Sequence, residues 1–168
     1  MYKIGDTIVY SDGKIYSIVD KLERDYGRGP QMYFELKQND LYKKDKSTSV
    51  FAPFAKVQEE SRDLSSKKEI LHLIDSFPAL EPFWINDCKQ RKIVFAEYST
   101  SRDIKQVAIL VKSIFLKNEE LKEINKAITI TDKMLFERLK TDLFIEISLV
   151  LKIELDSVVD FINNRLKK

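Results

Sequence analysis

The chain begins with Met1-Tyr-Lys-Ile-Gly-Asp-Thr-Ile-Val-Tyr-Ser11, and this stretch decides how its first part folds. Gly5 and Asp6 are typical of tight turns, because glycine tolerates a positive φ and aspartate bonds to nearby backbone groups. The residues from Thr7 to Tyr10 are β-branched or aromatic, which indicates a β-strand. A turn that leads directly into a strand at the N-terminus predicts a small β-module built for binding.

Further stretches of strand type follow before residue 64, and turn residues separate them. The predicted strands after the first are Ile15 to Glu23, Gln31 to Lys37 and Ser49 to Phe54. A fifth strand or an extended crossover is expected over Lys56 to Asp63. These elements predict a five-stranded barrel of the Tudor/SH3-like type over residues 1–64.

Beyond residue 64 the apolar residues recur with helical spacing, and three helix starts have similar capping signals. Ser66-Lys-Lys-Glu69, Thr100-Ser-Arg-Asp103 and Thr129-Ile-Thr-Asp132 each combine a hydroxyl with a carboxylate three residues later, as in a capping box. Glu81-Pro82 predicts the start of a helix over 81–98, and Asp156 to Leu166 predicts the last helix. Counting Ser66 to Ser76 as the first, we expect a bundle of about five helices. The chain is therefore predicted to be an α+β protein of two domains, residues 1–64 and 65–168.

Two apolar stripes mark the longest of these helices. Their spacing of about 3.6 residues is typical of helices that pack on other helices, so these side chains are expected in the core. The stripes consist of Ile104, Val107, Ala108, Val111, Ile114 and Phe115, and of Leu135, Leu139, Leu143, Ile147 and Leu151.

The composition argues against several classes of protein. The 168 residues are 43% hydrophobic but contain no apolar run as long as a membrane-spanning helix needs, and no signal-peptide pattern, so a cytoplasmic protein is expected. One cysteine, Cys88, and one histidine, His72, predict neither a disulfide nor a Cys/His metal site. Four glycines are too few for a phosphate-binding loop in addition to the turns. We therefore expect no enzyme, no cofactor and no small-molecule substrate.

The charges are distributed unevenly along the chain. Residues 1–64 contain eleven basic and eleven acidic side chains, and this neutral balance suits a protein partner. Residues 86–117 contain seven basic side chains against three acidic ones. A local excess of four positive charges predicts a weak contact with nucleic acid that a partner has to position.

Three groups of residues are candidates for binding. The first is the exposed edge of the predicted barrel with Arg24, Phe51 and Phe54, since an edge strand offers unpaired backbone groups to a partner. The alternative is that both phenylalanines lie in the core.

The second candidate for binding is Cys88-Lys-Gln-Arg-Lys92, a basic turn of helix near Trp84, suited to phosphate contact beside an apolar wedge. The alternative is a solvated helix face with Trp84 in the core. A third candidate is the loop from Tyr98 to Arg102, because it leads into a predicted helix start whose unpaired backbone N–H groups favour an anion.

Taken in order along the chain, several of these stretches resemble the CarD/CdnL family of bacterial transcription regulators. Members of that family begin with a Lys-hydrophobic-Gly-Asp-x-hydrophobic-Val-Tyr string, which is similar to Lys3 to Tyr10. Their helical domain contains a Trp-x-x-Arg segment, a Ser-Gly-Asp turn that opens a Val-rich helix, and a Leu-Ser-x-x-Glu cap. The corresponding stretches here are Cys88 to Arg91, Thr100 to Val111 and Ile128 to Phe136.

The resemblance implies that residues 1–64 bind the β subunit of bacterial RNA polymerase, with Arg24, Phe51 and Phe54 at the contact. It implies that residues 65–168 touch promoter DNA at the upstream edge of the transcription bubble and stabilise the melted complex. The residues implied in DNA contact are Trp84, Cys88, Lys89, Arg91, Lys92 and Arg102. Cys88 stands at the position of the family tryptophan, and whether Trp84 takes over its role stays open. The alternative is a divergent protein-interaction adaptor with the same fold that has lost DNA contact.

Overall fold

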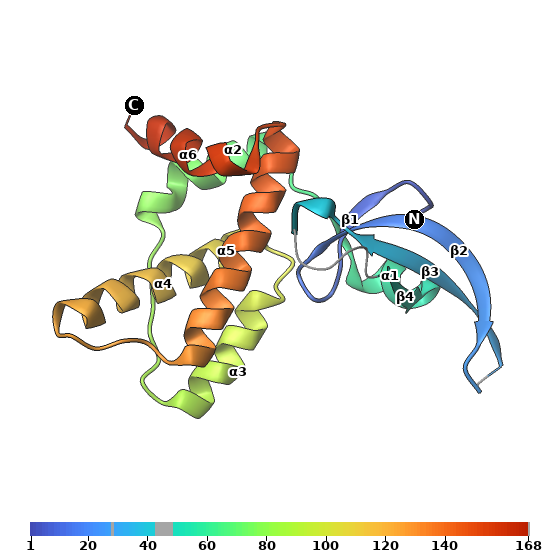
Figure 1. The fold of residues 1–168 in the computed structure, drawn as a ribbon, viewed down its shortest axis with the longest axis horizontal. Coiled ribbons are helices and arrows are strands. Elements are labelled where there is room, and N and C mark those ends of the chain that lie inside the picture. Colours follow the sequence, from blue (N-terminus) through green and yellow to red (C-terminus); the bar gives the residue numbers. More distant parts are fainter. Residues whose placement is uncertain (28, 43–48, 168) are drawn as a thin grey trace. The chain divides into compact units, whose positions relative to one another are not determined.

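The computed structural model describes residues 1–27, 29–42 and 49–167 (Figure 1). The chain divides into two compact units, Met1–Leu64 and Ser65–Lys168. The first is built around one antiparallel sheet and the second from helices, so the structure is α+β, as predicted. Among the described residues, no helix combines the length and apolarity that crossing a membrane requires.

The sheet of the first unit has five strands in the order β4-β3-β2-β1-β5. The strands are β1 (Thr7–Val9), β2 (Ile15–Asp25), β3 (Pro30–Gln38), β4 (Ser49–Pro53) and β5 (Arg62–Asp63). The first four lie where the sequence predicts them. In the part of the chain that the structure describes, the ladder ends at β4 on one side and at β5 on the other, so the sheet is open. The closed barrel that the sequence predicts is not observed.

The turn before β1 explains why the opening stretch determines this sheet. Gly5 has a φ of 93°, a conformation that glycine adopts without steric cost, and its N–H donates to the carbonyl of Ile18 at 2.8 Å. The N–H of Ile18 in turn donates to the carbonyl of Asp6 at 2.9 Å. The turn therefore fixes β1 against the middle of β2, and the apolar side chains of Ile8 and Ile18 enter the core of the unit together with Phe34 and Leu36.

The segment predicted as a fifth strand or crossover, Lys56 to Asp63, is mostly helical. Helix α1 (Phe54–Glu60) occupies it, and only the two residues of β5 are extended. The helix forms because this segment is rich in good helix formers and because it directs the fully buried Val57 into the core. Gln58 then binds the backbone of Tyr2, accepting from its N–H at 2.7 Å and donating to its carbonyl at 2.9 Å. With β5 so short, β4 and β5 are not bridged.

The second unit contains five α-helices in its described residues, the number predicted. They are α2 (Lys67–Ser76), α3 (Cys88–Ser99), α4 (Ile104–Glu123), α5 (Ile130–Leu151) and α6 (Val158–Leu166). Two clusters of buried side chains hold them: one joins α2, α5 and α6 with Ala108 of α4, and the other joins α3, α4 and α5. The two long helices α4 and α5 contribute to both clusters and form the centre of the unit (Figure 1).

The predicted helix over 81–98 begins later than expected. Helix α3 starts at Cys88, because the side chain of Asp87 caps it by accepting from the N–H of Gln90 at 2.8 Å. The residues before it form an irregular connection whose aromatic side chains, Phe83 and Trp84, pack against the α3–α4–α5 cluster. Pro82 is compatible with a first helical turn but does not start one here.

Two of the three predicted capping signals are confirmed. Ser66 and Glu69 form a reciprocal capping box at the start of α2, and Thr129 caps α5 by accepting from the N–H of Asp132 at 3.1 Å. The third prediction is wrong in register. Asp103 caps α4 by accepting from the N–H of Lys105 at 2.8 Å, whereas Thr100 is the C-cap residue that follows the preceding helix, α3. Aspartate is a strong cap itself, which moves the helix start three residues along.

This difference in register gives a test. The variant Asp103→Ala removes the side-chain acceptor that caps the N-terminus of α4. We expect it to lower the free energy of unfolding by about 1 kcal/mol. Thr100→Ala, the matched control, is expected to change it by less than about 0.5 kcal/mol. Urea denaturation followed by circular dichroism measures both. A larger loss for Thr100→Ala than for Asp103→Ala contradicts the observed capping.

Candidate functional site

The structure brings Arg24 of β2 and Phe51 of β4 together on one face of the sheet. The guanidinium carbon of Arg24 lies 5.4 Å from the centre of the Phe51 ring, within the range of a cation–π contact. Phe51 is 40% exposed although it is a large apolar residue in a strand. Its strand neighbour Ala52 is buried and faces the core, so Phe51 points away from the core on the outer face of the sheet.

Phe54, the third predicted residue of this surface, lies elsewhere. It is the first residue of α1, it is half-buried, and its ring packs against Phe34 of the core at 5.1 Å between ring centres. The ammonium of Lys21 lies 4.4 Å above the Phe54 ring. Lys21 is paired in register with the buried Phe34, which puts it on the core side of the sheet. Phe54 therefore packs against the core, as the alternative interpretation predicts, and is not part of the surface formed by Arg24 and Phe51.

Two tyrosines that the sequence analysis did not select complete the outer face. Tyr26 is 63% exposed, and its ring contacts that of Tyr33 edge-on at 5.2 Å between ring centres. Tyr33 is paired with Leu22 of β2 and with Pro53 of β4. The sequence does contain a signal for this surface. Side chains two residues apart in a strand point to the same face, so Leu22 and Arg24 of β2 are expected on one side of the sheet. We refer to Leu22, Arg24, Tyr26, Tyr33 and Phe51 as the outer-face patch.

The outer-face patch adjoins an open edge of the sheet. In the described chain β4 is paired only with β3, and the two residues in its centre, Val50 and Phe51, are 36% and 40% exposed. Open strand edges accept an added strand from a partner. Aromatic residues and arginine are the side chains most enriched at the centres of protein interfaces. The combination fits a protein-binding surface.

The second candidate surface is on α3. Cys88, Lys89 and Lys92 are all exposed, and they lie within the first turns of the helix. Ile93 is also on this side and is 62% exposed, a residue that the sequence analysis did not select. Its position is explained by the side chains that α3 buries, Arg91, Phe95 and Ser99, whose spacing of four residues turns Ile93 outward. We refer to Cys88, Lys89, Lys92 and Ile93 as the α3 face.

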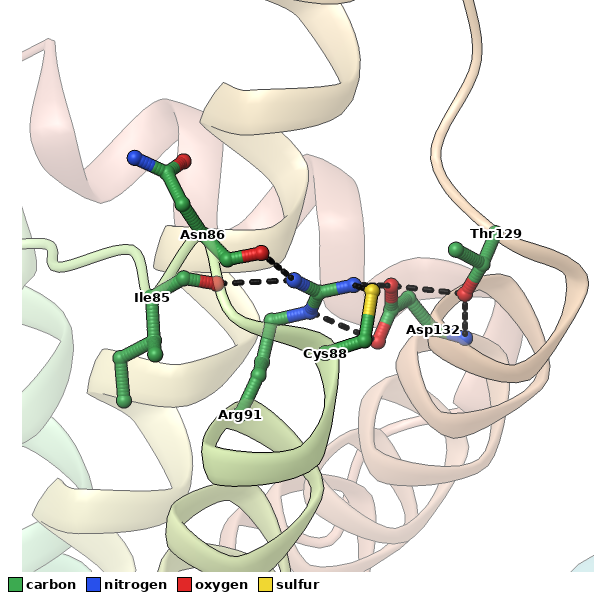
Figure 2. A network of polar contacts seen from close by, with 6 residues as sticks. All are labelled: Ile85, Asn86, Cys88, Arg91, Thr129 and Asp132. Carbon is green, nitrogen blue, oxygen red and sulfur yellow. Dashed lines mark hydrogen bonds and ion pairs between the residues drawn. The ribbon is translucent and has the colours of Figure 1, made fainter.

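Arg91 is not part of the α3 face but is buried, with 5% exposure. Figure 2 shows the network of polar contacts around it. Its guanidinium forms an ion pair with Asp132 of α5, donating from Nη2 to Oδ2 at 3.1 Å and from Nε to Oδ1 at 3.4 Å. Nη1 donates to the carbonyls of Ile85 and Asn86 at 2.8 and 3.2 Å, and Nη2 also contacts the Cys88 sulfur at 3.4 Å. All five N–H groups of the guanidinium therefore have an acceptor. A phosphate could reach Arg91 only by breaking this network.

The environment of Arg91 keeps it charged. Burial is the largest single influence and acts against the cation, but the hydrogen bonds to Asp132 and Cys88 outweigh it and raise the pKa of Arg91 above its ordinary value. Asp132 also accepts from the hydroxyl of Thr129 at 2.7 Å, so the carboxylate has partners on both sides. The pair is a buried ionic link between α3 and α5.

Trp84 lies underneath this link. The guanidinium carbon of Arg91 is 4.7 Å from the centre of the indole, and the Trp84 and Phe95 rings meet edge-on at 5.7 Å between ring centres. Trp84 is half-buried and packs on the α3–α4–α5 cluster. The ammonium of Lys117 is also 6.0 Å from the centre of the indole. Trp84 is therefore packed within the helical unit and is not exposed as a wedge in place of the family tryptophan would be.

Arg102 is exposed but lies beyond the other end of α3 from Lys89. Ten residues of helix separate Lys89 from Ser99, a distance of about 15 Å, so the structure does not bring Arg102 together with the α3 face. Next to it, the Asp103 carboxylate already occupies the N-terminus of α4, which makes that terminus a poor site for an anion.

Among the described residues, no three histidine, cysteine or acidic side chains are grouped as a metal site would need. No protein-family model matches the chain, and no curated protein sequence matches it.

The buried pair gives a stability prediction. Arg91→Met leaves the Asp132 carboxylate buried without its cation and frees two backbone carbonyls, so we expect a loss of about 3–5 kcal/mol in the free energy of unfolding. Lys92→Met, its exposed neighbour and control, is expected to change stability by no more than about 0.5 kcal/mol. Urea denaturation monitored by Trp84 fluorescence measures both. Equal stability of the two variants would show that the pair does not hold the helices.

Proposed function

We propose that the protein is a CarD-like transcription regulator whose N-terminal unit binds the β subunit of bacterial RNA polymerase and whose helical unit contacts promoter DNA. The observation that supports this best is the outer-face patch beside the open edge of β4. It combines Arg24 and Phe51, two residues that the resemblance assigns to the polymerase contact, with two further tyrosines. The strand order, an up-and-down run of four strands with a short fifth strand against β1, supports a Tudor-like origin of the sheet.

The DNA contact in this proposal is made by the α3 face. Lys89 and Lys92 supply phosphate contacts, and the exposed Ile93 and Cys88 supply an apolar surface beside them. Arg91 and Trp84 act indirectly, since they hold α3 and the connection before it in place. A contact that is available only after the strands have begun to separate stabilises the melted promoter, because it binds one of two states. The regulator catalyses no reaction and acts in the bacterial cytoplasm.

The alternative function is a protein-interaction adaptor that has lost DNA contact. The burial of Arg91 and the packing of Trp84 favour it, because they remove two of the predicted DNA contacts from the surface. Two exposed lysines alone give weak binding to a polyanion. The two functions differ in whether the α3 face matters for the promoter complex.

The polymerase contact is tested by binding of the full chain to the purified β subunit. Arg24→Glu reverses the charge in the centre of the outer-face patch and removes its cation–π contact, so we expect affinity to fall at least about tenfold. Lys3→Glu, an exposed cation in the same unit and outside the patch, is the control and is expected to bind like the unmodified chain. Biolayer interferometry measures both. If the unmodified chain does not bind, the polymerase assignment is wrong.

The DNA contact is tested with promoter complexes. The double variant Lys89→Glu/Lys92→Glu replaces both exposed cations of the α3 face. We expect it to shorten the lifetime of the open complex about tenfold or more, and to make that lifetime less dependent on salt concentration, because phosphate contacts are lost. The control is Lys67→Glu with Lys68→Glu, the same change on exposed residues of α2. If both double variants act like the unmodified protein while polymerase binding persists, the adaptor function is the correct one.

A further inference from the structure

The helical unit contains a groove that neither candidate surface uses. Its volume is about 720 Å³, and residues of α4 and α5 line most of it, with contributions from α2 and α6 at one end. The apolar lining includes Ala108 and Val111 of α4 and Leu143 and Ile147 of α5. Phe115 of α4 and Phe136 of α5 stack near its other end, 6.4 Å apart between ring centres. We refer to this feature as the α4–α5 groove.

The groove exists because the helices of this unit differ in length. Helices α4 and α5 have 20 and 22 residues, which makes each of them about 30 Å long. Helices α2 and α6 have only 10 and 9 residues, about half that length, and they pack at the C-terminal end of α5 (Figure 1). They cover part of the angle between the two long helices. The lining residues on α5 run from Lys133 to Ile147, which is four helical turns or about 21 Å.

Exposed apolar side chains lie both in the lining of the groove and beside it, and this indicates what kind of ligand fits. Phe115 is 48% exposed, although its place in the α4 stripe predicts a core position. Met134 and Ile130, on α5 next to the lining residues, are 69% and 80% exposed, and Val159 of α6 is 47% exposed. A small molecule inside the groove would leave Ile130, which lies one helical turn before the first lining residue of α5, in water. A helix that lies along the groove and extends past Lys133 would reach it. Exposed apolar patches of this kind mark protein interaction sites.

The charges around the groove specify the partner further. Four lysines and two glutamates line it, an excess of two positive charges. Both glutamates are already paired with lysines of their own helices, Glu119 with Lys122 at 2.6 Å and Glu137 with Lys140 at 2.7 Å. Lys112 donates to three carbonyls, those of Phe77, Pro78 and Leu80, and so holds the end of the groove in shape. Lys133 remains as an exposed cation at the rim, which favours an acidic partner.

We propose that the α4–α5 groove binds an amphipathic helix of a partner protein, about four turns long, with an apolar face and acidic flanks. Such a helix places side chains spaced i, i+3, i+4 and i+7 on the groove floor, a common mode of helix recognition. A carboxylate on its flank meets Lys133 at the rim. This contact is independent of the polymerase and DNA contacts, since it shares no residue with the outer-face patch or the α3 face.

The experiment is a selection of binders to the full chain from a displayed peptide library. The peptides are helices of about 16 residues with fixed leucines on one face and random flanking positions. We expect enrichment of helices with acidic flanks, and specific binding of the enriched peptide in fluorescence anisotropy. Absence of enrichment, or enrichment of basic flanks, overturns the proposal.

Matched variants then locate the binding. Phe115→Glu changes the groove, whereas Leu116→Glu changes a neighbouring side chain of similar exposure, 42%, that does not line it. We expect Phe115→Glu to weaken binding of the enriched peptide at least tenfold and Leu116→Glu to leave it within about twofold. Lys133→Glu is expected to weaken binding about threefold or more, with Lys126→Glu as control. Circular dichroism verifies that each variant is folded, and equal effects within either pair contradict the proposal.

Two other occupants would also overturn it. A concentration-dependent dimer in sedimentation equilibrium that Phe115→Glu dissociates would show that the groove binds a second copy of the chain. Displacement of the enriched peptide by stoichiometric oleate, with an affinity above that of the peptide, would show that an anionic amphiphile is the ligand. With neither result, and with both variant pairs behaving as expected, the helix is the occupant.

Discussion

The buried ion pair of Arg91 and Asp132 is the constraint on which the helical unit depends. It joins α3 to α5, and the same guanidinium holds the carbonyls of Ile85 and Asn86 (Figure 2). The guanidinium also lies over the Trp84 ring. A buried charge is tolerated only when it is paired and its hydrogen bonds are satisfied, and here every N–H of the guanidinium has an acceptor. Lysine could not replace it, since one ammonium with three donors cannot serve five acceptors in a planar fork. The pair therefore fixes which side of α3 is buried against α5 and which of its side chains face solvent.

Burial of Arg91 has a direct consequence for any action on DNA. The basic stretch of α3 presents two exposed lysines, not three cations, and affinity for a polyanion falls steeply with each lost phosphate contact. A surface this weak can act only at a high effective concentration of its target. Binding to polymerase through the N-terminal unit would supply that concentration, because it turns DNA contact into an intramolecular step. The proposed function thus requires both units. A low intrinsic affinity of the α3 face for DNA is consistent with a contact that polymerase binding positions.

Local signals in the sequence predict this fold well where one residue type decides the outcome. The turn at Gly5, the cap at Ser66 and the cap at Thr129 are all found as predicted. The errors arise where two local signals compete: Asp103 outcompetes Thr100 as a cap, and Asp87 outcompetes Pro82 as a helix start. The burial of Arg91 could not be predicted, because its partner is 41 residues away and an arginine between two lysines has the pattern of a solvated face. Long-range pairing, not propensity, decides such positions.

The exposure of Phe115 also could not be predicted from the sequence, and here the residue is apolar. Periodicity predicts that the α4 stripe is buried, but it does not say how many neighbouring helices exist to cover it. A helix of about 30 Å needs partners along its whole length, and α2 and α6 are too short to provide them. Where the neighbouring helices do not contact the whole apolar stripe, some of its side chains stay exposed to water and do not gain the free energy of burial. A partner helix in the α4–α5 groove restores that burial, and for this reason an exposed residue within a predicted core stripe is stronger evidence for a binding surface than an isolated exposed one.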